Sequence, residues 1–167
     1  MEVRVKDVEP LVLALADALR RRGLKLATAE SCTGGMIAAA CTAVAGSSDW
    51  FERGFVTYSN QAKVEAIGVD AALVAAHGAV SREVALAMAE GALAHSGAQL
   101  AVAVTGIAGP TGGTPTKPVG TVWLATARAG EATRAELLQL HGDRAAIRAE
   151  TVRQALQRLI DRANGAG

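Results

Sequence analysis

The run LAVAVT, Leu100 to Thr105, is the sequence feature that most restricts the fold. It is continuous and uncharged, a pattern typical of a β-strand that is covered on both faces. Most other segments of the chain carry apolar residues at helical spacing, with Gly or capping residues at their ends. We therefore expect an α/β fold in which helices pack on both faces of a sheet.

Capping and turn residues divide the remaining chain into helices and strands. The last two strands are joined by RAGEA, which is too short for a crossover helix, so we expect them to be antiparallel. The prediction for residues 1–167 is a single domain, a three-layer α/β/α sandwich with a mixed β-sheet. The expected elements are helix 10–22, strand 24–28, helix 36–44, a strand ending at Tyr58, helices 60–67, 71–77 and 81–94, strand 100–105, strands 119–127 and 133–140, and a helix from Asp143.

Composition and charge limit the kinds of molecule that the chain can be expected to bind. Half of the residues are hydrophobic but only 3% are aromatic, so the core must be built from Ala, Val, Leu and Ile. The net charge of +1 comes without a clustered basic face, and we expect no nucleic-acid partner. Neither the opening MEVRVKDVEP nor any later segment has the apolar span of a signal peptide or a membrane helix. Exposed alanine-rich helices favour a homo-oligomer, which we expect to be a dimer.

The spacing of the two cysteines indicates whether the protein works in a reducing or an oxidising compartment. Cys32 and Cys41 fall on one short strand-to-helix segment, and nine residues of helix separate them by too much rise for a disulfide. We expect two free thiols and a reducing, cytoplasmic location.

The segment AESCTGG, residues 29–35, lies between an expected strand and an expected helix. Ser31 and Cys32 are candidate nucleophiles, and Gly34 and Gly35 let a substrate approach the backbone. N–H groups of Cys32, Thr33, Gly34 and Gly35 at a helix N-terminus could hold an oxyanion, which suits acyl transfer. The alternative is a helix cap in which Ser31 or Thr33 accepts an N–H bond.

Lys63 is the candidate base. If Ser59 caps helix 60–67, Lys63 lies near its first turn, where the helix dipole tends to lower the pKa of an amine. A partly neutral lysine can act as a base toward a serine hydroxyl, and Tyr58 could relay a proton or orient the amine. The alternative is a solvated surface lysine beside a buried tyrosine.

The loop GIAGPTGGTPTKPVG, residues 106–120, holds five of the 18 glycines and three of the four prolines. Such a loop on a rigid scaffold is typical of a functional site, and its N–H groups could bind a phosphate. A plain Pro/Gly turn cluster is equally compatible, because the loop matches neither a Walker nor a Rossmann pattern.

Other charged residues leave several alternatives open. Glu30 could be a buried partner for Lys63 or an end-of-strand charge. Arg144 and Arg148 lie one helical turn apart and could reach an anionic ligand, or could be paired surface arginines. His77, His95 and His141 have no metal-ligand spacing around them, so we expect no metal site.

Several long motifs together carry a family resemblance. The segments AESCTGG, GSSDWFERGFVTYSNQAKVEAIGV, HGAVS, VTGIAGPTGG, KPVGTVW and GDR occur in collinear order. They resemble the CinA C-terminal domain family, the nicotinamide-nucleotide amidohydrolases or NMN deamidases of the PncC type.

That resemblance implies hydrolysis of the carboxamide of nicotinamide mononucleotide to nicotinic acid mononucleotide and ammonia, in pyridine-nucleotide salvage, without a metal or cofactor. Ser31 resembles the family's nucleophile, Lys63 its base and Tyr58 a catalytic or positioning residue. The expected substrate-binding residues are Glu30, Thr105, Gly106, Ile107, Ala108, Gly109 and Arg144. The competing hypotheses are a non-catalytic nucleotide-binding module of the competence/damage-inducible type and an amidase for another small amide.

Overall fold

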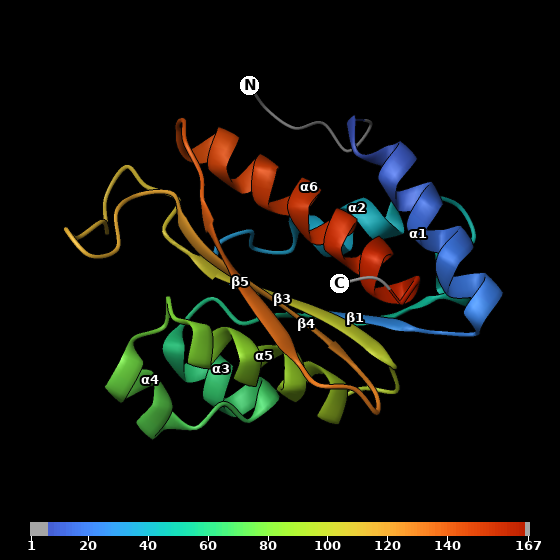
Figure 1. The fold of residues 1–167 in the computed structure, drawn as a ribbon, viewed down its shortest axis with the longest axis horizontal. Helices are drawn as coiled ribbons and strands as arrows, with labels where there is room; N and C mark the ends of the chain where they lie inside the picture. Colours follow the sequence, from blue (N-terminus) through green and yellow to red (C-terminus); the bar gives the residue numbers. More distant parts are fainter. Residues whose placement is uncertain (1–6, 166–167) are drawn as a thin grey trace.

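The computed structural model describes residues 7–165, which form a five-stranded mixed sheet between two layers of helices (Figure 1). The predicted α/β sandwich is therefore confirmed. In chain order the elements are α1 (Glu9–Arg22), β1 (Leu26–Glu30), α2 (Met36–Thr42), the short 3-10 helix η2 (Ser47–Asp49), β2 (Phe51–Val56), α3 (Asn60–Ile67), α4 (Ala71–His77), α5 (Arg82–Ala94), β3 (Leu100–Gly106), β4 (Thr121–Arg128), β5 (Arg134–Gln139) and α6 (Arg144–Ala163).

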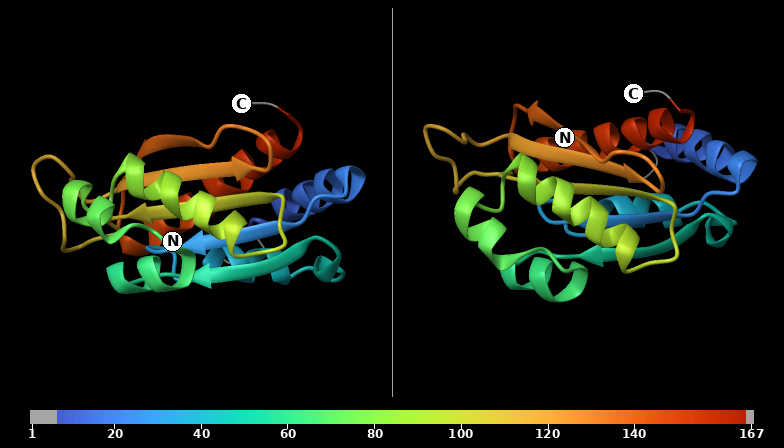
Figure 2. Two further views of the ribbon diagram at one scale, coloured as in Figure 1. Left: turned by 90° about the horizontal axis from the view of Figure 1, so that it is seen from below. Right: turned by 60° about the horizontal axis from the view of Figure 1, so that its bottom comes forward.

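The strand order is β2-β1-β3-β4-β5, and the strands can be followed side by side in Figure 2. β1 is parallel to both β2 and β3, whereas β4 is antiparallel to β3 and β5. The predicted antiparallel pairing of the last two strands is thus confirmed. Because β1, β2 and β3 run in the same direction, their carboxyl ends lie at one edge of the sheet, where ligands of α/β proteins usually bind.

The two faces of the sheet differ in side-chain size. Leu100, Val102 and Val104 of β3 belong to the core beneath α1, α2 and α6, whereas Ala101 and Ala103 belong to the core beneath α5. Alternate residues of a strand point to opposite faces, so one apolar run serves both layers. The core is built mainly from Ala, Val, Leu and Ile, as composition predicted.

Some boundaries differ from the predictions by about two residues. β1 begins at Leu26, not Leu24, because Gly23 adopts a left-handed conformation (φ 64°) and the N–H of Leu24 still donates to Leu19 O of α1. β1 also extends to Glu30, so Ser31 is the first residue after the strand. α2 ends at Thr42 rather than Val44, and β2 ends at Val56 rather than Tyr58.

Residues 7–165 contain neither a membrane-spanning helix nor a cluster of metal-ligand side chains. No helix in this part of the chain combines the length and apolar character needed to cross a bilayer. The same residues contain no group of three or more His, Cys, Asp or Glu side chains placed to hold a metal ion. The expectation for the opening MEVRVKDVEP falls partly on residues 1–6, which lie outside the described residues.

Candidate active site

Ser31 and Lys63 meet at the carboxyl edge of the parallel strands. Ser31 directly follows β1, and its N–H donates to Val104 O of β3 at 3.1 Å, which fixes the position of the turn. Lys63 extends from α3 and places Nζ 3.1 Å from Oγ of Ser31. The two residues are only 8% and 1% exposed. A hydroxyl and an amine 32 residues apart in sequence are therefore within proton-transfer distance.

The surroundings of Lys63 favour the neutral amine. Nζ donates to Thr57 O at 3.0 Å and to Tyr58 O at 3.2 Å, and no carboxylate among residues 7–165 forms an ion pair with it. Burial lowers the pKa of Lys63, and the nearby Cys32 thiol acts weakly in the opposite direction. In the structure Nζ also donates to Oγ of Ser31. A neutral amine keeps two N–H groups for the two carbonyls and has one lone pair, which can accept the proton of Ser31.

Two sequence-based ideas about Lys63 need correction. The alternative of a solvated lysine beside a buried tyrosine is wrong, because Lys63 is buried and Tyr58 is 61% exposed. The helix dipole was expected to lower the pKa of the amine, but burial is the main cause. The predicted cap is present, since Oγ of Ser59 accepts from the N–H of Ala62.

Glu30 has a role that neither sequence-based alternative anticipated. Its carboxylate accepts from the N–H groups of Ile37 and Ala38 and from Oγ1 of Thr33, at 2.6 to 3.0 Å. It is therefore neither a partner of Lys63 nor a free end-of-strand charge. Both oxygens are engaged inside the protein, and Glu30 does not line the cavity beside Ser31. It fixes α2 behind the Ser31 turn.

This internal carboxylate also changes the expected set of oxyanion donors. The first N–H groups of α2 point at Glu30, and the N–H of Gly34 donates to Ser31 O at 3.0 Å. Thr33, Gly34 and Gly35 do not line the cavity, whereas Cys32 does. The alternative of a cap by Ser31 or Thr33 is not observed either, because the N-cap residue is Gly35 and it has no side-chain cap bond.

Cys32 is a weaker competitor for Ser31 than its position suggested. Burial raises the pKa of its thiol to about 11, and the charge of Glu30 acts in the same direction. The thiolate is the nucleophilic form, so at neutral pH this cysteine is held as an unreactive thiol. The second cysteine, Cys41, is also free and buried, and its pKa is raised to about 12 by burial.

Arg144 and Arg148, the two arginines at the start of α6, have different contacts. Arg144 lines the cavity, where it donates to Gly109 O at 2.8 Å and lies 3.4 Å from the hydroxyl of Tyr58. Arg148 lies under the turn instead, donating from Nε to Cys32 O and from Nη2 to Thr33 O. Of these two residues, Arg144 is the one at the cavity, and Arg148 holds the backbone of the Ser31 turn.

The glycine-rich loop closes the cavity on the side of β3. Thr105 and Gly106 line the cavity, and Oγ1 of Thr105 donates to Ala79 O at 2.9 Å. A Cβ on Gly106 would meet Val122 at 2.6 Å, so this position excludes any side chain. Lys117 fastens the outer part of the loop to the end of α4 by donating to His77 O.

Ile107 and Gly109 do not line the cavity. The N–H of Ile107 donates to Thr121 O at the start of β4, and its carbonyl accepts from the N–H of Gly120. Gly109 contributes its carbonyl to Arg144. Ala108 does line it. Of the five predicted loop residues 105–109, the structure thus brings three to the cavity and leaves two in supporting positions.

The cavity beside Ser31 has a volume of about 230 Å³. Three lining residues were missing from the predicted site: Asn60, Ala79 and Val80. Their signal was present, since Asn60 follows the Ser59 cap and HGAVS was one of the resembling motifs. The full lining is Ser31, Cys32, Tyr58, Asn60, Lys63, Ala79, Val80, Thr105, Gly106, Ala108 and Arg144.

The arrangement is matched by a known family. The model of the CinA C-terminal domain family matches residues 8–163, almost the whole chain. The chain belongs to the CinA C-terminal domain family. The resemblance read from the sequence motifs is confirmed.

Members with curated names fall into two length groups. The chain is 53% identical to the nicotinamide-nucleotide amidohydrolase PncC of Pseudomonas putida, over 92% of this chain and 95% of that protein. It is 54% identical to the PncC of Escherichia coli strain K12, over 87% of this chain and 88% of that protein. A CinA-like protein of Citrifermentans bemidjiense is 57% identical over 90% of this chain, but the chain spans little more than a third of it, 36%.

Solved structures agree with the fold. The competence/damage inducible protein CihA from Agrobacterium tumefaciens superposes with a TM-score of 0.92 at 47% identity, covering 98% of both chains. A CinA superfamily protein from Klebsiella pneumoniae superposes with a TM-score of 0.90 at 39% identity. The architecture around Ser31 and Lys63 is therefore that of this superfamily.

Proposed function

We propose that this chain hydrolyses the carboxamide of nicotinamide mononucleotide, giving nicotinic acid mononucleotide and ammonia, with Ser31 as nucleophile and Lys63 as general base. The observation that carries the proposal is the distance of 3.1 Å between the buried amine of Lys63 and the hydroxyl of Ser31 in a cavity. Among residues 7–165 this amine has no ion-pair partner. The choice of substrate rests on relatives of nearly the same length that are named nicotinamide-nucleotide amidohydrolases.

In the first half-reaction, neutral Lys63 accepts the proton of Ser31 as Oγ attacks the amide carbon. We assign the stabilisation of the negative charge that develops on the amide oxygen to the N–H of Cys32, because Cys32 is the residue of the turn 32–35 that lines the cavity. The lysine ammonium then gives its proton to the departing nitrogen, and ammonia leaves. Ser31 is left as an ester of the nicotinic acid moiety.

In the second half-reaction, a water molecule takes the place of ammonia. Lys63 removes a proton from this water as the oxygen attacks the ester carbon, and the proton returns to Oγ of Ser31 as the ester breaks. The products are the free carboxylic acid and the regenerated serine and neutral amine. The carbonyls of Thr57 and Tyr58 keep Nζ in place through both half-reactions.

Arg144 is the residue that we expect to bind the phosphate of the substrate. Arg144 lines the cavity, where it donates to a carbonyl and to a tyrosine hydroxyl, and no carboxylate among residues 7–165 forms an ion pair with it. A phosphate is the matching ligand for such a group. Tyr58 then acts by positioning: its carbonyl holds Lys63 and its hydroxyl lies beside Arg144.

The test is ammonia release from nicotinamide mononucleotide by the purified protein and by two variants. Ser31→Ala removes the nucleophile and is expected to lower kcat by about 10³-fold or more, an effect typical of losing a member of such a catalytic unit. Cys32→Ala is the matched control, because it alters the neighbouring cavity side chain and is expected to keep kcat within a few-fold.

Other outcomes separate the competing hypotheses. Saturable binding of the nucleotide without ammonia release would favour a non-catalytic binding module. Turnover of another small amide, with none of the nucleotide, would favour a different amidase. An active Ser31→Ala with an inactive Cys32→Ala would move the nucleophile to the thiol.

A further inference from the structure

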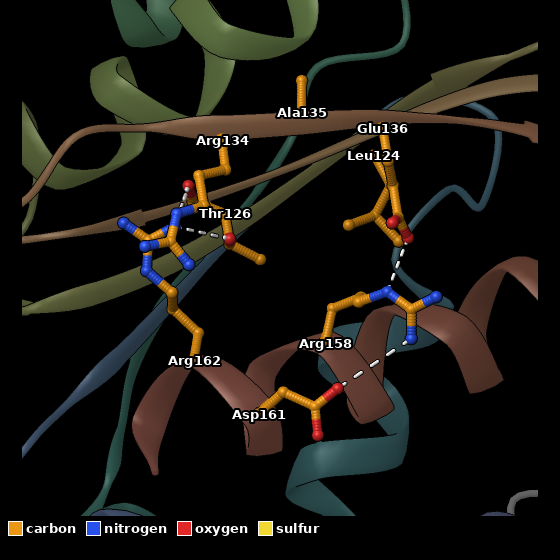
Figure 3. A pocket seen from close by; sticks show the side chains of 8 residues that line it. All are labelled: Leu124, Thr126, Arg134, Ala135, Glu136, Arg158, Asp161 and Arg162. Atoms are coloured by element: carbon orange, nitrogen blue, oxygen red, sulfur yellow. Dashed lines mark hydrogen bonds and ion pairs between the residues drawn. The ribbon is translucent and has the colours of Figure 1, made fainter. Parts of the chain in front are cut away.

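A second cavity lies between the C-terminal half of α6 and the edge of the sheet at β4 and β5 (Figure 3). Its volume is about 410 Å³, larger than that of the cavity at Ser31 and within the range of small-molecule sites. The two cavities share no lining residue. Leu124, Thr126, Arg134, Ala135, Glu136, Arg158, Asp161 and Arg162 line it.

The two sides of this cavity differ in charge, as Figure 3 shows. On one side Arg158 is neutralised, since it contacts Glu136 at 2.6 Å and Asp161 at 4.0 Å. On the other side stand Arg134 and Arg162, beside Thr126. Within the described residues 7–165, Arg134 has no ion-pair partner. The positive charge is therefore concentrated at one end.

Arg162 is held rigidly at that end. It is 2% exposed, and it donates to Thr126 O, to Oγ1 of Thr126 and to Ala132 O. Its Nε has no hydrogen-bond partner, because the nearest carboxylate oxygen, on Glu131, is 3.8 Å away. Burial lowers its pKa, and the charges of Arg134 and Arg128 act in the same direction. A fixed, incompletely satisfied guanidinium thus faces a second one that repels it.

Glu131 compensates this repulsion only in part. It is shared between Arg128, at 3.2 Å, and Arg162, and its side chain is 42% exposed. Around the cavity, four arginines (128, 134, 158 and 162) face three carboxylates (131, 136 and 161), which leaves one positive charge in excess. An oxyanion between Arg134 and Arg162 would balance it, giving Arg134 an anionic acceptor and Arg162 a further one.

We propose that this cavity binds a small oxyanion-bearing metabolite, with its phosphate or carboxylate group between Arg134 and Arg162 and the rest of the molecule against Leu124 and Ala135. The site is separate from the reaction at Ser31. Arg144 and Arg162 are 18 residues apart on one helix, which corresponds to about 27 Å.

Calorimetric titration at constant ionic strength tests this proposal, with pyrophosphate as the phosphate probe and citrate as the carboxylate probe. All proteins carry Arg144→Gln, so that an anion cannot bind through Arg144 at the Ser31 cavity. Saturable binding is expected, and the preferred probe identifies the chemical class of the anion. Arg134→Gln is expected to weaken that binding at least tenfold, because it removes an unpaired, exposed cation without disturbing the core.

Two further variants make the result specific. Arg82→Gln on α5, on the opposite face of the sheet, removes the same charge and is expected to leave the affinity unchanged. Glu131→Gln is expected to tighten binding severalfold, since it removes the competing carboxylate. The proposal fails if neither probe binds saturably, if Arg134→Gln binds as well as its parent, or if Arg82→Gln weakens binding equally.

Discussion

Two basic side chains are buried among residues 7–165, Lys63 and Arg162, and they differ in what burial does to them. Both are almost inaccessible, at 1% and 2% exposure, and both donate mainly to backbone carbonyls. Burial lowers the pKa of each. A lysine amine can respond by losing its proton, whereas a guanidinium keeps its charge in proteins.

The difference assigns the two cavities to different chemistry. At Ser31, burial lowers the pKa of a lysine that lies next to a hydroxyl, which supports the proposed role of a base. At β5, a guanidinium in a comparable environment remains a cation, which supports the proposed binding of an anion. The larger cavity is therefore not the place of the proposed reaction, because none of its lining residues pairs a nucleophile with a base. Side-chain chemistry decides the assignment, and cavity size does not.

Replacing the base gives the largest expected effect in this comparison. Lys63→Met removes the amine while filling a similar volume, and we expect kcat to fall by about 10² to 10⁴-fold, the usual contribution of a general base. Lys63→Arg keeps a cation at this position but cannot supply a lone pair, so it should be as inactive as the Met variant. Ammonia release at saturating nucleotide measures both.

Circular dichroism and thermal unfolding of the two Lys63 variants serve as controls for folding. A well-folded Lys63→Arg that retains most of the activity would contradict the role of a neutral amine. In that case the positive charge of position 63, and not its basicity, would be what the reaction uses.

Removing the other buried cation is expected to change stability and leave the chemistry intact. Arg162→Met leaves Thr126 O and Ala132 O without their side-chain donor, at a cost of about 1–3 kcal/mol in the free energy of unfolding. Urea denaturation measures this cost. The value of kcat per folded molecule should stay within about twofold, and a drop as large as that of Lys63→Met would show that the two cavities are not independent.

Much of the fold follows from local sequence signals. LAVAVT became a strand buried on both faces, and the caps at Ser59, Asp70, Ser81 and Asp143 start the helices that they predicted. These features depend on residues close together in sequence, through strand burial and side-chain capping. Strand ends were less accurate: the C-cap of α1 extends to Leu24, so the pairing of β1 with β2 and β3 begins only at Leu26.

The site was predictable in its residue types but not in its contacts. Motifs suggested Ser31, Lys63 and Arg144 together, yet only the folded chain shows an amine 3.1 Å from a hydroxyl. Glu30 was misassigned because its partners are the N–H groups of Ile37 and Ala38, which become donors only after α2 has formed. The charged cavity at β5 had no sequence signal, since α6 meets the sheet edge only in three dimensions.

The lowered pKa of Lys63 also has a definite sign in its effect on stability. Between the lowered value and the ordinary value of about 10.4, the unfolded chain binds more protons than the folded one, so stability rises with pH in this interval. Below the lowered value the amine is charged in both states, and the buried charge disfavours the folded state by its full amount. The same protonation removes the base, so activity should fall about tenfold per pH unit below that value.

The most direct test is therefore an NMR titration of the Lys63 side chain in the folded protein, with Lys63→Arg used to assign its signal. The account predicts a midpoint below about 10.4, coinciding with the acidic limb of the pH profile of kcat/KM. A Lys63 amine that titrates at or above the ordinary value, in a protein that still releases ammonia, would contradict it.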